Sequence, residues 1–254
     1  MTSAGTPRGL LFGTAAESYE RYRLGYPDQV VDRTLAYAGR PVAEAVEVGA
    51  GTGKATRAFA SRGVRVRALE PDPDMHAVLQ RETAAMPVEP VLTTFEAYDG
   101  PPTGLVYAAA AWHWTDPSTR WTHAADLLEP GGVLAIFGSQ LRLADPALEE
   151  AVGRALADRV DDSASRPEDE PSAPAWRLAE IEGSGLFQDV RSHDLAREVT
   201  VSQEEYVGHL STISAFLRLG VEDRQKVLRR VVELVPAQVT LDASVVLQLA
   251  RRRS

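Results

Sequence analysis

The first half of the chain alternates short apolar, β-branched runs with amphipathic stretches, which is the pattern that βαβ units produce. The apolar runs predict strands at 43–48, 64–69, 88–94, 105–111 and 133–138. The amphipathic stretches predict helices at 53–61 and 73–81, and a further helix that Thr115 or Asp116 caps and Pro130-Gly131-Gly132 ends. Because strand crossovers are right-handed, these strands are expected to form one parallel sheet with helices on both faces.

The alternation of short apolar runs with amphipathic stretches ends after Gly138. An apolar stripe predicts a helix at 145–160, and the acidic, proline-bearing stretch 161–174 predicts an exposed loop. The remaining pattern predicts late strands at 190–201 and 239–250. Between them it predicts helices at 204–219 and 223–235. Too little chain follows the acidic loop for a second domain, so residues 1–254 are expected to form one domain.

Composition narrows the class of partner. Apolar residues make up 44% of the chain and charged residues 25%, as in ordinary globular proteins, and a net charge of -9 argues against nucleic acid as the main partner. The absence of cysteine excludes thiolate metal sites and cysteine nucleophiles, and it favours a cytoplasmic location. No run approaches the ~18 apolar residues of a membrane helix, so no membrane partner is expected. The arginine-rich end, "RRRS", is expected to be a solvated terminus, and the bias toward arginine and alanine suggests a bacterial source.

The stretch "VEVGAGTGKAT", residues 46–56, joins a predicted strand to a predicted helix through three glycines, which is a common ligand-binding arrangement. A phosphate loop matches only at its end, because Val48 stands where its first glycine belongs and Ala55 where its hydroxyl belongs. A dinucleotide fingerprint matches at its first two glycines, but Lys54 takes the third position. Both readings are therefore disfavoured without being excluded.

What remains is the pattern E-x-G-x-G-x-G, formed by Glu47, Gly49, Gly51 and Gly53. A carboxylate next to a pyrophosphate would repel it, whereas it suits a cation. S-adenosylmethionine (SAM) carries an ammonium and a sulfonium group, so it becomes the favoured ligand. The alternative is that Glu47 only caps or pairs locally.

The ends of the next two strands suggest an adenosine site. Glu70 follows the glycine turn by roughly 20 residues, where α/β nucleotide sites place an acid that accepts both ribose hydroxyls. Met75 could pack on the adenine or belong to ordinary helix packing. Phe95 and Glu96 lie where the other side of the adenine is expected, with a core position for Phe95 equally open.

These motifs resemble the class I SAM-dependent methyltransferases, in particular the methyltransferase type 11 and trans-aconitate-methyltransferase-like group. The segments that carry the resemblance are "FGTAAESYERYRLGYP", "VEVGAGTGKAT", "LEPDPDM", "FEAYDG", "AAAAWHWTDP", "LLEPGGVLAIFG" and "EEYVGHLSTIS". The resemblance implies an α/β fold with a Rossmann-like seven-stranded sheet, mostly parallel with an antiparallel last strand. It also implies helical lid segments at about 10–27, 140–180 and 203–236.

The resemblance and the motifs together give a set of cofactor-binding residues. They are Tyr19, Arg23, Glu47, Gly49, Ala50, Gly51, Gly53, Glu70, Pro71, Met75, Phe95, Glu96 and Ala110. The first two belong to the N-terminal lid, where a plain amphipathic helix packed on the sheet is the alternative.

Methyl transfer from a sulfonium is an in-line displacement, which needs alignment and a dry pocket but no metal. Trp112 and Trp114 are expected to form an apolar wall beside the acceptor, and His113 to act as a base; alternatively His113 fixes the turn and the tryptophans are core. Tyr22 and His209 complete the expected substrate-binding residues.

The sequence therefore predicts a SAM-dependent methyltransferase that acts on a small-molecule acceptor, with O-methylation ahead of N- or C-methylation. The alternatives are a SAM-binding protein without turnover and an NAD-dependent oxidoreductase. No oligomeric state is indicated.

Overall fold

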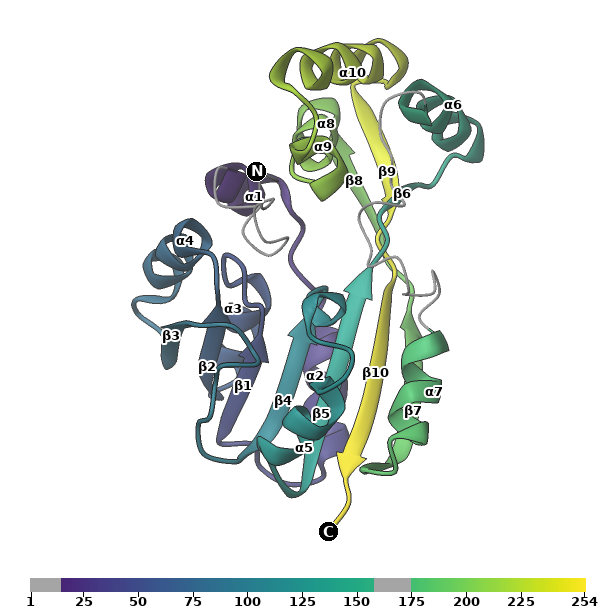
Figure 1. Ribbon diagram of the computed structural model, residues 1–254. Helices are drawn as coiled ribbons and strands as arrows, with labels where there is room; N and C mark the ends of the chain where they lie inside the picture. Colours follow the sequence, from purple (N-terminus) through teal and green to yellow (C-terminus); the bar gives the residue numbers. More distant parts are fainter. Residues whose placement is uncertain (1–14, 158–174) are drawn as a thin grey trace, which may run out of the picture. The chain divides into compact units, whose positions relative to one another are not determined.

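The strands predicted for the first half of the chain form the greater part of one sheet in the computed structural model, which describes residues 15–157 and 175–254 (Figure 1). The chain divides into two units. The described residues of the larger unit are 25–138, 175–195 and 245–254, and those of the smaller unit are 15–24, 139–157 and 196–244.

The sheet of the larger unit has seven strands in the order β3-β2-β1-β4-β5-β10-β7. Their bounds are β1 Glu44–Val48, β2 Arg65–Glu70, β3 Val88–Leu92, β4 Thr103–Ala109, β5 Leu128–Ser139, β7 Phe187–Leu195 and β10 Val245–Arg252. The pairs β1-β2, β1-β4, β2-β3 and β4-β5 are parallel, whereas β10 pairs antiparallel with β7. The mostly parallel Rossmann-like sheet with an antiparallel last strand is confirmed.

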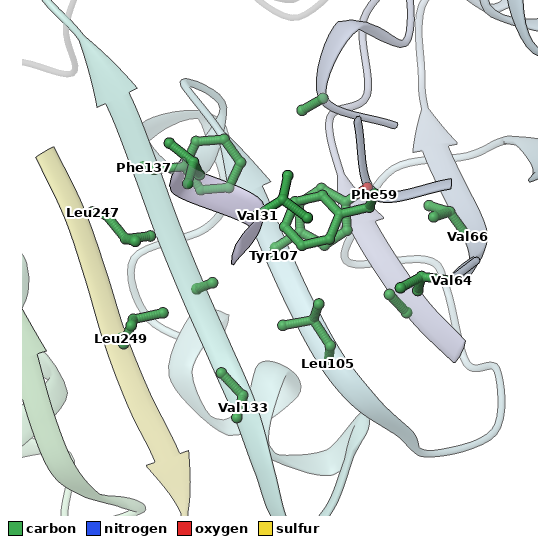
Figure 2. Close-up of a cluster of buried hydrophobic side chains, with 14 of the residues drawn as sticks. Val31, Phe59, Val64, Val66, Leu105, Tyr107, Val133, Phe137, Leu247 and Leu249 are labelled. Carbon is green, nitrogen blue, oxygen red and sulfur yellow. The ribbon is translucent and has the colours of Figure 1, made fainter. Parts of the chain in front are cut away.

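Alternation along the strands supplies two apolar faces. Leu105 and Tyr107 of β4 join the cluster under α2 and α3, shown in Figure 2, while Val106 and Ala108 join the cluster under α5 and α7. The helices of this unit are α2 Asp28–Ala38, α3 Lys54–Ala60, α4 Pro73–Thr83, α5 Arg120–Asp126 and α7 Ala175–Gly183, with a 3-10 turn, η3, at Trp112–Trp114. Helices therefore cover both faces of the sheet, as predicted.

The third predicted helix is shorter than its sequence signals indicate. Although α5 begins at Arg120, Asp116 caps the turn that leads into it: its side chain accepts the backbone N–H and the hydroxyl of Ser118, and its carbonyl accepts the Arg120 N–H at 2.9 Å. The predicted end at Pro130 to Gly132 is wrong, because these residues lie inside β5. The register between β4 and β5 shifts there, and Gly131 takes a φ of 74°, so the dipeptide Gly131-Gly132 marks a bulge in a strand.

The smaller unit contains a three-stranded antiparallel sheet in the order β6-β9-β8. Its elements are α1 Ala16–Tyr22, β6 Arg142–Leu143, α6 Pro146–Ala157, β8 Glu198–Ser202, α8 Gln203–Ser211, α9 Ser214–Leu217, α10 Val221–Leu234 and β9 Gln238–Asp242. Val227 and Val231 of α10 pack with strand residues and with Phe216 in the core of this unit. Of the predicted features, residues 10–14 of the first lid segment and residues 158–174, with the acidic loop, lie outside the described residues.

The two late strands predicted from the sequence are each two strands in different sheets. The first divides into β7 and β8 at Ala196 and Arg197, and the second into β9 and β10 at Ala243 and Ser244. Asp242 causes the second break, because its Oδ1 accepts the N–H and the hydroxyl of Ser244 at 3.0 and 2.6 Å and turns the chain locally. In the described part of the chain, no helix has the length and apolarity to cross a membrane.

The arginine-rich C-terminal end is solvated only in part, because Arg253 and Ser254 are exposed whereas Arg251 and Arg252 are partly buried. The Arg251 guanidinium donates to the carbonyl oxygens of Tyr37 at 2.6 Å, Gly131 at 3.1 Å and Ala38 at 3.3 Å, and lies 4.9 Å from the Tyr37 ring centroid. These contacts give a cation to the carbonyl end of α2, where the helix dipole favours it. Arg252 and Arg253 also donate to backbone carbonyls, those of Leu128 and Phe187.

We therefore expect Arg251→Gln to lower the free energy of unfolding by about 2 kcal/mol, because charge-assisted hydrogen bonds to partly buried carbonyls are lost. That loss corresponds to a melting temperature lower by about 4 to 8 °C. Differential scanning calorimetry measures the effect, with Arg65→Gln, an exposed arginine on β2 of the same unit, as the control. Equal melting temperatures for the two variants would contradict a stabilising role for Arg251.

Candidate functional site

The glycine loop lies between β1 and α3, at the edge of the sheet where the carboxyl ends of β1, β2 and β4 meet. Gly49 has a φ of 65°, and a Cβ built on it would lie 2.6 Å from the Cβ of Ala111, so no side chain fits. Gly53, with a φ of 88°, precedes α3, and a Cβ there would meet Leu79 at 2.7 Å. The loop is also tied to β2, because the Ala50 N–H donates to the Leu69 carbonyl at 2.9 Å.

Glu70 ends β2 and lies directly beside this loop. Its Oε2 accepts the Gly51 N–H at 2.7 Å, and its Oε1 accepts the Asp72 N–H at 2.9 Å. The side chain is buried, and this burial raises its pKa to about 7 against the opposing effect of the two N–H donors. Each carboxyl oxygen keeps a second lone pair that can accept a ligand hydroxyl. Glu70 thus braces the loop, and both of its carboxyl oxygens keep acceptor capacity for a diol.

The start of α4 shows a residue that the sequence analysis missed. The Asp72 side chain accepts the N–H groups of Asp74 and Met75, at 2.9 and 3.1 Å, and so caps the helix. The signal was present, since an aspartate followed by proline is typical of a helix start. Pro71 is partly exposed at this turn, whereas Met75 is buried, which favours a packing role for its side chain.

Glu47 does not face the edge of the sheet as a free charge. It is 1% exposed, and its Oε2 accepts the hydroxyls of Thr56 at 2.5 Å and Tyr107 at 2.9 Å. Burial raises its pKa to about 8 against the effect of these two hydroxyl donors, so the neutral form is favoured at pH 7. A neutral carboxyl has no charge to offer a cation. The structure therefore favours the alternative in which Glu47 pairs locally.

The loop after β3 is anchored by α5, whose residues share an apolar cluster with Phe95. Phe95 is buried, its ring contacts that of His123 of α5 edge-on at 4.6 Å, and the His123 Nε2 forms a 2.8 Å hydrogen bond with the Phe95 carbonyl. Glu96 is exposed, and its Oε1 accepts the Asp116 N–H at 2.9 Å. His123 carries no role in the sequence analysis, because nothing in one sequence shows which carbonyl a helical histidine will meet.

The residues of the segment after β4 differ in their exposure to solvent. Ala110 is exposed and has a φ of 55°, a conformation that alanine rarely adopts and that often marks functional sites. Trp112 is 1% exposed and packs against Phe95 and Trp121, which favours the core alternative for this residue. His113 and Trp114 are partly exposed, with ring centroids 4.6 Å apart.

Tyr19 and Arg23 lie together in the smaller unit. Arg23 donates from Nε to the Thr212 hydroxyl at 2.8 Å and from Nη2 to the Thr212 carbonyl at 3.1 Å, and its guanidinium lies 5.0 Å from the Tyr19 ring centroid. His209 is buried nearby, and burial together with the Arg23 charge lowers its pKa to about 3. His209 is therefore neutral at pH 7.

Tyr22 packs on α8 in the same unit. Its hydroxyl donates to Glu204 at 3.2 Å, and its ring covers Gly208, where a Cβ would lie 2.5 Å from the ring. Among the described residues, no group of three or more histidine or acidic side chains is arranged to hold a metal ion. The predicted site residues thus fall into two groups, with the four lid residues Tyr19, Tyr22, Arg23 and His209 in the smaller unit and all others in the larger.

Comparison with known proteins gives a consistent family. A family model described as a methyltransferase domain matches residues 46–136. Uncharacterized methyltransferases of Mycobacterium tuberculosis and Mycobacterium bovis are 39% identical over 139 residues, which is 54% of this chain and 55% of the relative. The match thus spans about half the length of these curated relatives.

Solved structures share the fold. A protein described as a type II methyltransferase from Anaeromyxobacter dehalogenans aligns over 91% of this chain and 97% of its own, with a TM-score of 0.61 and 20% identity. Phosphoethanolamine N-methyltransferase 2 of Haemonchus contortus, in complex with SAM, aligns over 99% of this chain and 61% of its own, with a TM-score of 0.59 and 13% identity. With the glycine loop, Glu70 and the strand order β3-β2-β1-β4-β5-β10-β7 in place, residues 46–136 are similar to methyltransferase domains, and the chain shares the fold of solved methyltransferases.

Proposed function

We propose that this protein transfers a methyl group from SAM to a small-molecule acceptor, with an oxygen atom of the acceptor as the favoured target. The observation that carries the proposal is the contact between Glu70 and Gly51, 2.7 Å from carboxyl oxygen to backbone nitrogen. This contact holds the Glu70 carboxyl, which can accept hydrogen bonds from hydroxyl groups, beside a loop that has no room for side chains. A ligand with a ribose next to a compact polar end fits this pairing, and SAM is such a ligand.

Several residues fit SAM and one does not fit the role first expected of it. Gly49 and Gly53 keep the loop open to close backbone approach, Glu70 retains free lone pairs, and the strained Ala110 is exposed at the same edge of the sheet. Glu47 is the exception, because it is buried and bonded to protein hydroxyls. The proposal therefore assigns ribose binding to Glu70 and no direct charge recognition to Glu47.

When bound, the sulfonium of SAM supplies an electrophilic methyl group and leaves as the neutral thioether of S-adenosylhomocysteine. The acceptor provides the electron pair for the new bond, and a protonated acceptor must also lose its proton. The candidate base is His113, which lies in the segment that follows β4. Its ring and that of Trp114 are partly exposed. A hydroxyl acceptor would use such a base, which favours O-methylation in the proposal.

The predicted lids stay part of the proposal. Most of their described residues fall in the smaller unit, where α6, α8 and α10 share one core and Tyr22 of α1 packs on Gly208 of α8. This common core supports the view that the three lid segments act as one element. Contacts of Tyr19 and Arg23 with the cofactor, and of Tyr22 and His209 with the acceptor, remain predictions, as does the organisation of residues 1–254 as one domain with lids.

Two other functions remain as outcomes of the tests: a SAM-binding protein without turnover, and an NAD-dependent oxidoreductase. Titration with SAM, S-adenosylhomocysteine and NAD, followed by thermal shift, separates the ligands because only a ligand that binds the folded state raises the melting temperature with its concentration. We expect a rise of several degrees with SAM and S-adenosylhomocysteine and none with NAD. A rise with NAD alone would overturn the proposal.

Glu70→Ala is expected to weaken binding of S-adenosylhomocysteine by ~10 to 150-fold, corresponding to ~1.5 to 3 kcal/mol for hydrogen bonds to a charged acceptor. Isothermal titration calorimetry measures the affinity. Glu89→Ala, which removes an exposed carboxylate from β3, is the control and should bind as the wild type does. Wild-type affinity in Glu70→Ala would exclude ribose recognition by this residue.

His113→Ala is expected to lower the rate of methyl transfer by about 100-fold, since removal of a general base costs on the order of 10² to 10⁴ in rate. Affinity for SAM should be largely kept. Single-turnover formation of S-adenosylhomocysteine with an identified acceptor gives the rate, and calorimetry gives the affinity. His193→Ala, on β7 of the same unit, is the matched control; a His113→Ala rate equal to that of the control would remove the base from the mechanism.

A further inference from the structure

Glu47 joins three elements beneath the glycine loop. It lies in β1, two residues before Gly49, and accepts hydrogen bonds from Thr56 of α3 and Tyr107 of β4. Tyr107 is itself fully buried and stacks on Phe59 of α3, with ring centroids 4.2 Å apart. Figure 2 shows these two rings side by side within the apolar cluster. The carboxyl group therefore sits at a junction that determines where the loop begins and where α3 starts.

The hydrogen-bond partners of Glu47 carry no positive charge. Both donors are neutral hydroxyls and both reach the same oxygen, Oε2, while Oε1 is buried with no hydrogen-bond partner among the described residues. At 1% exposure, a carboxylate without a cationic hydrogen-bond partner is costly, so burial favours the protonated form. Burial has the largest effect on its pKa and raises it. The hydrogen bonds from Thr56 and Tyr107 and the charge of Arg57 lower the pKa, and the charge of Glu70 raises it.

We propose that Glu47 is a positioning residue that holds the glycine loop as an uncharged carboxyl, through Thr56 and Tyr107, rather than a group that recognises a cationic ligand by its charge. The inference rests on the proposed function in one respect only, namely that the loop it positions binds SAM. An amide has the same shape and keeps a carbonyl oxygen for both hydroxyls. Glutamine should therefore replace Glu47, whereas alanine should not.

The test compares wild type, Glu47→Gln and Glu47→Ala by calorimetric titration with S-adenosylhomocysteine at pH 7. Glu47→Gln should bind within about 3-fold of wild type, because both hydroxyl donors keep their acceptor. Glu47→Ala should bind at least 10-fold more weakly. If Glu47→Gln is as weak as Glu47→Ala, the carboxylate charge matters and the inference is overturned. Should Glu47→Ala fail to fold, Tyr107→Phe replaces it, since this variant keeps the ring stack and loses one donor.

A second measurement needs no cofactor. A carboxyl whose pKa is raised from 4.5 to about 8 on folding binds its proton more tightly in the folded state, so it contributes stability below pH 4.5 that is lost as pH rises toward 8. Glu70, with a pKa of about 7, contributes in the same direction, and its contribution is lost mostly before that of Glu47. Between pH 7 and 8, the free energy of unfolding should therefore fall more steeply in wild type and in Glu89→Ala than in Glu47→Gln.

Chemical denaturation across this pH range measures the slope. Equal slopes in wild type and Glu47→Gln would overturn the inference. If wild type binds neither SAM nor S-adenosylhomocysteine, the proposed function fails, while the pH slope still decides the state of Glu47.

Discussion

The close approach of the glycine loop to the chain that leaves β4 is the constraint on which the site depends. Gly49 and Ala111 come so near that a Cβ on Gly49 would lie 2.6 Å from that of Ala111. The strand ends can meet this tightly only if the loop adopts left-handed conformations, which glycine permits. Once the loop is fixed there, Glu70 reaches Gly51, Ala50 reaches Leu69, and α3 begins at a set position.

Two buried carboxyl groups lie close to this loop, and they accept hydrogen bonds from different kinds of donor. Glu70 accepts backbone N–H groups and sits at the edge of the sheet, so it can exchange some of its interactions with a ligand. Glu47 accepts hydrogen bonds from side-chain hydroxyls inside the apolar cluster and is 1% exposed. The two glutamates thus differ in their donors, which are backbone N–H groups for Glu70 and hydroxyls for Glu47, and burial raises the pKa of both.

Local signals predicted the strands and helices of the larger unit well, and they failed where a contact distant in sequence decides. Gly131-Gly132 ends no helix because β4 pairs with this stretch through a bulge. The late strands divide at Arg197 and Ala243 because each runs from one sheet to another. Arg251 is held by the carbonyl end of α2, which lies more than 200 residues away in the chain. Periodicity cannot report any of these, since it reflects only the local face of an element.

The sequence by itself determined the resemblance to methyltransferases, the glycine loop, the alternation of strands and helices, and the acid at the end of β2. These follow from residue type and short-range spacing, because backbone conformation and periodic burial are local properties. Only the tertiary structure decided that Glu47 is enclosed by Thr56 and Tyr107, that Trp112 is core, and that His123 holds the loop of Phe95. Those roles depend on which side chains from distant segments meet, and on the burial that raises or lowers each pKa once they do.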